Sequence, residues 1–187
     1  MELKGFNEKK IQERAIAILN SGRPGWDIPH TLATVYWMKE LLAGEGGDGP
    51  VLICAAYLHD IGYSQVEFAN NWDGIHQAKN DHMAKGAAMA AGLIKDFPLT
   101  EGQQKEIVHL VEVHDKLDML STKNEILLFE ADSLGQIDNE RAKSTFKGKD
   151  LEKFLYLFKQ RRMPRFATAS GKKFLAHLWP AAKKSFS

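Results

Sequence analysis

The most informative segment of this chain reads Val51-Leu52-Ile53-Cys54-Ala55-Ala56-Tyr57-Leu58-His59-Asp60-Ile61-Gly62. Its first eight residues are apolar or small on nearly every side, which is typical of a helix buried at the centre of a domain. His59 and Asp60 come at the end of this predicted helix, and Gly62 can break it directly afterwards. Two side chains that commonly bind metals therefore stand next to each other at the edge of a core.

Two further metal-binding side chains lie on other amphipathic segments. His30 stands in the first turn of a helix predicted to begin near Asp27, and Asp132 lies inside the helical pattern of residues 122–137. Histidine nitrogen and carboxylate oxygen are the usual ligands of catalytic metal sites, which leave positions open for water or substrate. Cys54 is the only cysteine, so neither a thiolate site nor an intrachain disulfide is available.

The ordered pattern His, His-Asp, Asp resembles that of the HD-domain superfamily of metal-dependent phosphohydrolases. The resemblance covers roughly residues 25 to 138 and implies a divalent ion held by His30, His59, Asp60 and Asp132. Two departures are visible. Glu130 stands where many relatives have aspartate, which retains a carboxylate. Ile61-Gly62-Tyr63 lacks the acidic residue that some nucleotidases of the superfamily carry after the His-Asp pair, and this counts against that subgroup.

Two more histidines occupy places that the resemblance assigns to a second ion. HD proteins with two metals carry extra histidines between the His-Asp pair and the final aspartate, and this chain has His82 and His114 there. Binding substrate phosphate and donating a proton are alternative roles for both. His109 lies five residues before His114, ~140° around a helix, so the two should face different sites. His76 and His177 are expected on the surface.

The expected cofactor is one or two divalent ions. A nitrogen and oxygen ligand set suits Mn, Fe, Co, Ni, Zn or Mg, and the sequence does not choose among them. Asp60 can both bind the metal and accept a proton from the attacking water. Lys85 lies about one turn after His82 on the same predicted helical face, so it is a candidate for holding a phosphate, and Asp115 is expected to be exposed to solvent.

Helical periodicity predicts an all-α fold, a single compact HD-like bundle of about six to eight helices over residues 1–187. The metal-site core is expected at about residues 25–138, with C-terminal helices at 149–184 packed on it. Residues 64–81 are polar and irregular, with Asn70-Asn71-Trp72-Asp73-Gly74 at their centre, and predict a wall or lid over the site. The predicted helices cover residues 7–19, 27–42, 50–60, 82–97, 100–113, 122–137, 149–162 and 168–184.

Composition limits the partners. The net charge of +1 points to no nucleic-acid polymer, and no apolar run approaches the ~20 residues that span a bilayer, so no membrane partner is expected either. No secretory signal is recognised at the start of the chain, and the cytoplasm is the expected compartment. The sequence does not decide whether the protein forms a homodimer. Arg161, Arg162 and Arg165 form a basic cluster, favoured as a solvated helix face, with binding of substrate phosphates as the alternative.

These features lead to a metal-dependent phosphohydrolase that acts on a small phosphate ester or nucleotide, a small phosphorylated substrate in either case. The six-residue pattern also resembles HD-fold di-iron oxygenases, which cleave carbon bonds of small polyols or phosphonates. A third alternative is a nucleotide-binding HD domain without turnover. Metal content and dependence on dioxygen would separate the first two.

Overall fold

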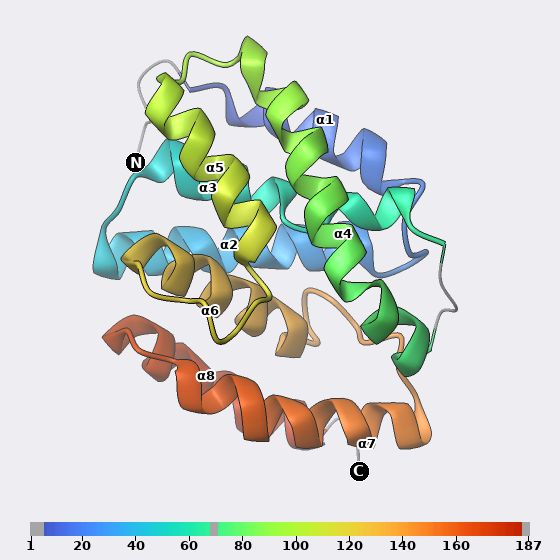
Figure 1. Ribbon diagram of the computed structural model, residues 1–187. Coiled ribbons are helices and arrows are strands. Elements are labelled where there is room, and N and C mark those ends of the chain that lie inside the picture. Colours follow the sequence, from blue (N-terminus) through green and yellow to red (C-terminus); the bar gives the residue numbers. More distant parts are fainter. Residues whose placement is uncertain (1–5, 68–70, 185–187) are drawn as a thin grey trace.

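A computed structural model describes residues 6–67 and 71–184 of the chain. Over these residues the protein consists of eight α-helices joined by short 3-10 and π segments, and no strand occurs among them (Figure 1). The all-α prediction is therefore confirmed. The helices are α1 (Glu8–Leu19), α2 (Asp27–Glu45), α3 (Gly49–Leu58), α4 (Trp72–Leu93), α5 (Glu101–Val113), α6 (Lys123–Ile137), α7 (Gly148–Leu157) and α8 (Ala169–Lys184).

Helix α3 lies at the centre of the core. The Asp48 carboxylate caps it by accepting a hydrogen bond from the Val51 amide, and Pro50 occupies the first turn, where its missing N–H costs nothing. Every residue from Val51 to Leu58 is buried, which explains why the helix is apolar all round. Because α1, α2, α5 and α6 all contact it, α3 carries the His-Asp pair into the middle of the protein.

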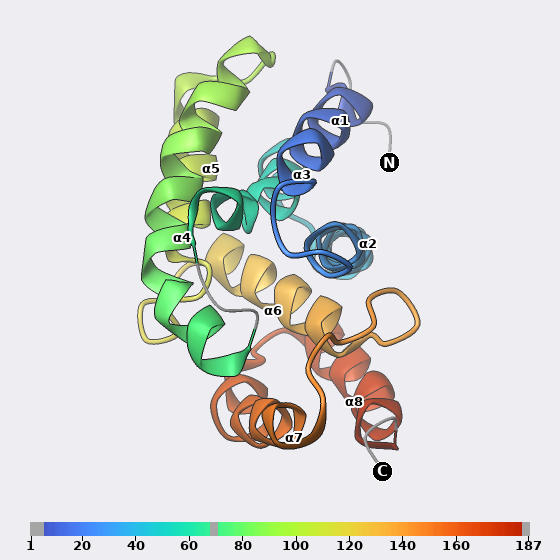
Figure 2. The same ribbon diagram turned by 90° about the vertical axis from the view of Figure 1, so that its right-hand side faces the viewer.

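Three groups of helices surround α6. Figure 2 shows α4 and α5 on one side, α1, α2 and α3 on the other, and α7 and α8 below. α6 packs along α2 and also contacts α8. Capping boxes of Thr100 with Gln103 and of Thr122 with Glu125 begin α5 and α6, which confirms the starts predicted near residues 100 and 122. None of the helices within the described ranges is long and apolar enough to cross a bilayer.

The expectation that residues 64–81 are irregular is wrong for the second half of the segment, which is helical. After the 3-10 turn η1 (Ile61–Gln65), α4 begins at Trp72, where the Asn71 side chain accepts from the Gly74 amide. The turns before His82 bury only small residues, Gly74 and Ala78, so the segment lacks the large apolar side chains that reveal a helical period. Residues 68–70, including the predicted loop residue Asn70, lie outside the described part of the chain.

The predicted helix at 149–162 changes type before its end. α7 stops at Leu157 and continues as the π-helical turn η3 (Phe158–Arg162) and the 3-10 turn η4 (Met163–Arg165). π turns are frequent at functional sites. Phe154, Phe158 and Arg162 are all buried, so this segment turns an arginine toward the core.

Candidate metal centre

Four side chains from α2, α6 and the end of α3 form a first ligand set. His30 from the first turn of α2 and His59 from the end of α3 place their Nε2 atoms 3.2 Å apart. Asp132 of α6 puts its Oδ1 atom 3.0 Å from His30 Nε2 and 3.7 Å from His59 Nε2. Asp60 Oδ2 lies 3.6 Å and 3.5 Å from the same two nitrogens. Two imidazoles and two carboxylates thus converge on one point.

The second set shares Asp60 with the first. His82 of α4 and His114 at the end of α5 place their Nε2 atoms 3.4 Å apart. Asp60 Oδ1 lies 3.4 Å from the His82 nitrogen and 3.5 Å from the His114 nitrogen. Each oxygen of the Asp60 carboxylate therefore faces one histidine pair, so Asp60 belongs to both sets.

Each histidine pair is oriented in the same way. One member donates its Nδ1 proton to a carbonyl three residues earlier, His59 to Ala56 at 2.9 Å and His114 to Val111 at 2.8 Å. These bonds fix the tautomer and leave the Nε2 lone pair facing the centre. The other member of each pair is held by ring stacking. The rings of His30 and Trp26 lie 5.0 Å apart, and those of His82 and Tyr63 lie 4.0 Å apart.

Arg23 joins the two sets from the turn between α1 and α2. Its guanidinium lies over both stacking partners, 4.2 Å from the Tyr63 ring centre and 5.8 Å from that of Trp26. It donates to Asp27 at 2.6 Å and approaches Asp60 Oδ2 at 3.4 Å. One buried cation thus contacts the bridging carboxylate and the two rings that align a histidine of each set.

The protonation states fit a metal site. Burial lowers the pKa of His59 to about 4, so its imidazole is neutral at neutral pH. Burial alone would raise the pKa of Asp60, but the adjacent histidines His59, His114 and His82 outweigh it and hold that pKa well below its ordinary value. Neutral imidazole and ionised carboxylate are the ligand forms of both groups. The donor set, the tautomers of His59 and His114 and the protonation of His59 and Asp60 therefore suit divalent metal. Burial alone would lower the pKa of His114, but Asp60, Asp115 and Asp132 raise it, so that imidazole must release its proton when an ion binds.

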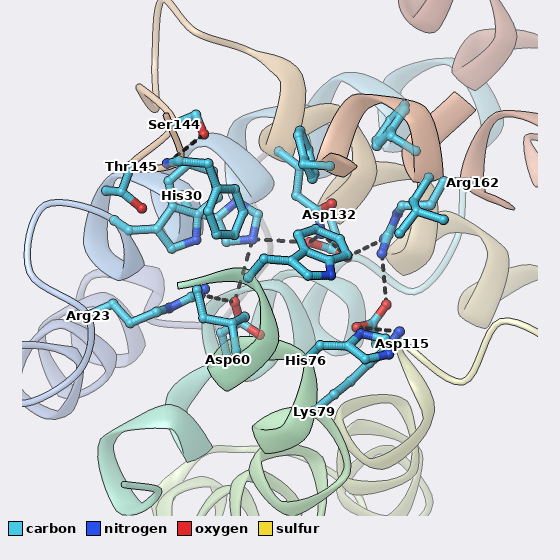
Figure 3. A pocket seen from close by; sticks show the side chains of 18 of the residues that line it. Arg23, His30, Asp60, His76, Lys79, Asp115, Asp132, Ser144, Thr145 and Arg162 are labelled. Atoms are coloured by element: carbon cyan, nitrogen blue, oxygen red, sulfur yellow. Dashed lines mark hydrogen bonds and ion pairs between the residues drawn. The ribbon is translucent and has the colours of Figure 1, made fainter. Parts of the chain in front are cut away.

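Arg162 holds the outer oxygen of Asp132. Its guanidinium donates to Asp132 Oδ2 at 2.5 Å, to Asp115 Oδ1 at 2.7 Å and to the Ser133 hydroxyl at 2.8 Å. Lys79 of α4 pairs with the second Asp115 oxygen at 3.0 Å. The solvated-face prediction is wrong for Arg162, and so is the expectation of solvent exposure for Asp115, because the two side chains neutralise each other beside the ligands (Figure 3).

Some candidate residues lie elsewhere. Lys85 is exposed on α4 and donates to the Gln65 carbonyl at 2.6 Å, so the structure does not bring it to the ligand sets. His109 turns away from His114 and contacts Glu125 at 2.7 Å. Glu130 is buried, but it accepts hydrogen bonds from the Ala167 and Thr168 amides and so secures the start of α8.

A cavity of about 160 Å³ opens beside the centre. His30, Asp60, His114 and Asp132 line its inner end. His76, expected simply on the surface, is exposed but also lines the cavity. Figure 3 shows Arg23 and Arg162 on opposite sides of Asp60 and Asp132, with Lys79 and His76 near Asp115. The remaining lining includes Arg161 and a series of apolar side chains, Trp26, Tyr63, Trp72, Ile75, Leu117, Phe146, Phe154, Leu157 and Phe158.

The model of the HD domain family matches residues 28–136, more than half of the chain. The chain belongs to the HD domain family. A crystal structure of a predicted HD superfamily hydrolase from an uncultured Thermotogales bacterium is similar in fold, with a TM-score of 0.66 and 19% sequence identity over 95% of this chain and 87% of that one. No curated protein matches the chain.

The six candidate ligand residues of this HD domain all lie within the matched residues, whereas several cations around them do not. Arg23 precedes residue 28, and Arg161 and Arg162 follow residue 136. Little in the sequence pointed to Arg23, because it stands in the turn Ser21-Gly22-Arg23-Pro24-Gly25. A signal for Arg162 was present in the sequence. Phe154, Phe158 and Arg162 are four residues apart, so they lie on the same face of a helix, and the two phenylalanines indicate that this face is buried.

Proposed function

We propose that this HD domain is a metal-dependent phosphohydrolase that cleaves a small phosphate ester. The observation that carries the proposal is the charge of the cavity beside the paired ligand sets. Arg23, Lys79, Arg161 and Arg162 line it, and three of them are paired with carboxylates. Arg161 has no acidic partner among the described residues, so its guanidinium is available to an anionic substrate.

Each residue has a definite role in this proposal. His30, His59, Asp60 and Asp132 would hold one ion, and Asp60, His82 and His114 a second. When bound, a divalent ion supplies a Lewis acid that favours attack of water on phosphorus. Arg161 binds nonbridging phosphoryl oxygens and neutralises the charge that grows on them.

The reaction also needs a proton acceptor and a proton donor. The attacking water forms the new P–O bond and loses a proton, for which the ionised Asp60 carboxylate is an acceptor. The ester P–O bond breaks, and the leaving oxygen takes a proton to become an alcohol. His76 is exposed at the cavity, and the described residues provide no polar partner for its ring, so it can donate that proton. Lys85 takes no part.

Arg161→Gln tests the proposal, with Lys159→Gln as the matched control. Lys159 is exposed on the same π-helical turn and does not line the cavity. Loss of a cation that binds phosphate should raise KM for phosphate monoesters about tenfold, equivalent to ~1.4 kcal/mol, and the control should match the wild type. Chelation should abolish turnover, and Mn, Co, Ni or Mg should restore it under nitrogen as well as in air. Equal KM values for both variants would contradict the role of Arg161.

A di-iron oxygenase is the second candidate. The observation in its favour is the bridging position of Asp60 between two histidine pairs, a ligand arrangement that two iron ions also accept. An uncharged polyol would have no need of the Arg161 guanidinium, so the charge of the cavity favours hydrolysis over oxygenation of a polyol. A phosphonate would use the same cation, and the dependence on dioxygen separates its oxygenation from hydrolysis. Turnover that requires dioxygen and consumes it in proportion to product would decide for oxygenation.

A further inference from the structure

We infer that the substrate is a phosphate monoester whose organic group is an apolar ring, and that this ring lies against a wall formed by α7 and the loop before it. The inference rests on the proposed function, because it assigns the phosphate end of the same substrate to the metal centre and Arg161. It differs from that proposal in naming the second half of the molecule that the cavity accepts.

The wall is a group of aromatic rings in mutual contact. The centre of the Trp72 ring lies 5.7 Å from that of Phe146 and 6.4 Å from that of Phe154, and the last two are 5.9 Å apart. These rings come from the start of α4, the loop after α6 and the middle of α7. All three line the cavity. Separate segments thus bring aromatic faces to one place.

Packing of α7 does not account for the whole wall. Phe154 and Phe158 are buried, as rings that attach a helix to a core should be. Trp72, Phe146 and Leu157 also line the cavity but remain partly exposed. Apolar surface left in contact with water inside a concave site is a source of binding free energy for an apolar ligand, since binding removes it from water.

The order of residues along α7 and η3 gives the orientation of the substrate. The cavity-lining residues of this segment recur every three or four positions on one face of the helix. The first three are apolar and the last two are cationic. Arg162, at the cationic end, contacts the proposed metal ligand Asp132. The phosphate therefore faces the ligand sets and Arg161, and the ring faces Phe154, Phe146 and Trp72. The five residues in order are Phe154, Leu157, Phe158, Arg161 and Arg162.

The apolar end of the cavity offers few hydrogen-bond partners to a polar group. Sugar hydroxyls buried against Trp72, Phe146 and Leu157 would lose hydrogen bonds to water and find no acceptor on these side chains, where the Trp72 indole N–H is the one donor. Ser144 and Thr145 also line the cavity, and the Ser144 hydroxyl accepts a hydrogen bond from the Phe146 amide at 3.2 Å. A compact ring next to the phosphate fits both halves of the lining, and a polyhydroxylated chain fits only one.

Binding of two phosphonates, which cannot be hydrolysed, tests the inference. Phenylphosphonate and methylphosphonate carry the same anionic head and differ in the ring. Calorimetric titration of the Mn-loaded full-length protein should give at least about tenfold tighter binding of phenylphosphonate, ~1.4 kcal/mol. Phe146→Ala and Leu157→Ala should each reduce that ratio while leaving methylphosphonate binding unchanged. Tyr156→Ala, on the same helix at a side chain that is 63% exposed and outside the cavity, should keep the wild-type ratio.

The outcomes separate the inference from the proposed function. A wild-type ratio below about threefold, less than half of the expected free energy, overturns the ring wall and leaves the phosphate site intact. Failure of both phosphonates to bind contradicts the phosphohydrolase proposal itself. Since the wild-type ratio requires no variant, a poorly folded Phe146→Ala protein does not weaken the test.

Discussion

Replacing Gly62 with alanine tests how the two ligand sets are kept at their spacing. Gly62 lies in η1, two residues after Asp60, and η1 packs directly on α4. A Cβ atom on Gly62 would lie 1.9 Å from the His82 carbonyl oxygen and 2.6 Å from the Gly86 amide nitrogen. Both obstacles are backbone atoms, so no side chain can rotate away. The close approach of η1 to α4 therefore depends on the absence of a side chain at this position.

The magnitude follows from these distances. Ordinary contact with the carbonyl oxygen needs more than 3 Å, so η1 and α4 must separate by about 1 Å or more, and overpacking of this kind costs ~1–3 kcal/mol. The upper end applies because two rigid elements must move. His82 belongs to the displaced helix, and its Nε2 atom now lies 3.4 Å from Asp60 Oδ1. The second ligand set should open, whereas the first, which contains no α4 residue, should persist.

Gly92→Ala is the matched control. Gly92 lies near the end of the same helix, and a Cβ atom there would meet nothing within 4 Å. The control should be as stable as the wild type or up to ~1 kcal/mol more stable, because alanine favours helix. Urea unfolding followed by circular dichroism measures stability, and elemental analysis measures bound metal. Gly62→Ala should lose ~3 kcal/mol and one of two ions. Wild-type stability with two ions bound would refute the close-packing explanation.

Three further changes address the ligands and the charges around them. Asp60→Ala removes the carboxylate shared by both sets, so bound metal should fall far below the wild-type level while the helical circular dichroism survives; full metal stoichiometry in a folded variant would exclude a bridging ligand. Arg23→Met should lower occupancy of both ions, since Arg23 contacts Asp60 and the rings behind His30 and His82, and a loss confined to one ion would contradict this role. Glu125→Gln should destabilise the protein by up to about 3 kcal/mol near neutral pH. Burial alone would raise the pKa of Glu125, but hydrogen bonds from Thr122, His109 and Ser121 lower that pKa from 4.5 to about 2. Because the folded-state pKa is lowered, this stabilisation is complete above pH 4.5 and is lost as pH falls toward 2, so urea unfolding at several pH values should show the two proteins converging in acid.

The candidate ligands that sequence reasoning selected come together in the structure, and each stands at a recognisable point of a helix. His59 and Asp60 follow an apolar run whose burial the composition alone requires, and His30 follows a start signalled by Asp27 and Pro29. The capping boxes fixed the starts of α5 and α6 within a residue. Which face of α5 turns inward could also be predicted, since helical geometry separates His109 from His114.

The cations and rings around the ligands could not be predicted in the same way. Arg23 acts through stacking and ion pairs with residues up to 40 positions away, such as Tyr63 and Asp60. A guanidinium in a turn looks solvated unless its distant acidic partners are known. The early start of α4 was hidden for a related reason: Gly74 and Ala78 fit beneath other elements only in the folded chain.

The charges that the fold assembles around the centre explain why a cation belongs there. Four carboxylates, those of Asp27, Asp60, Asp115 and Asp132, meet three basic side chains, Arg23, Lys79 and Arg162. Burial lowers the pKa of His59 to about 4, so His59 adds no charge at neutral pH. Burial alone would also lower the pKa of His114, but the carboxylates of Asp60, Asp115 and Asp132 raise it. Buried charge without compensation is costly, and the neighbouring cations and histidines hold Asp60 and Asp132 ionised. A divalent cation would supply the compensating charge in place of a proton on His114, so metal binding and the stability of this core should rise together.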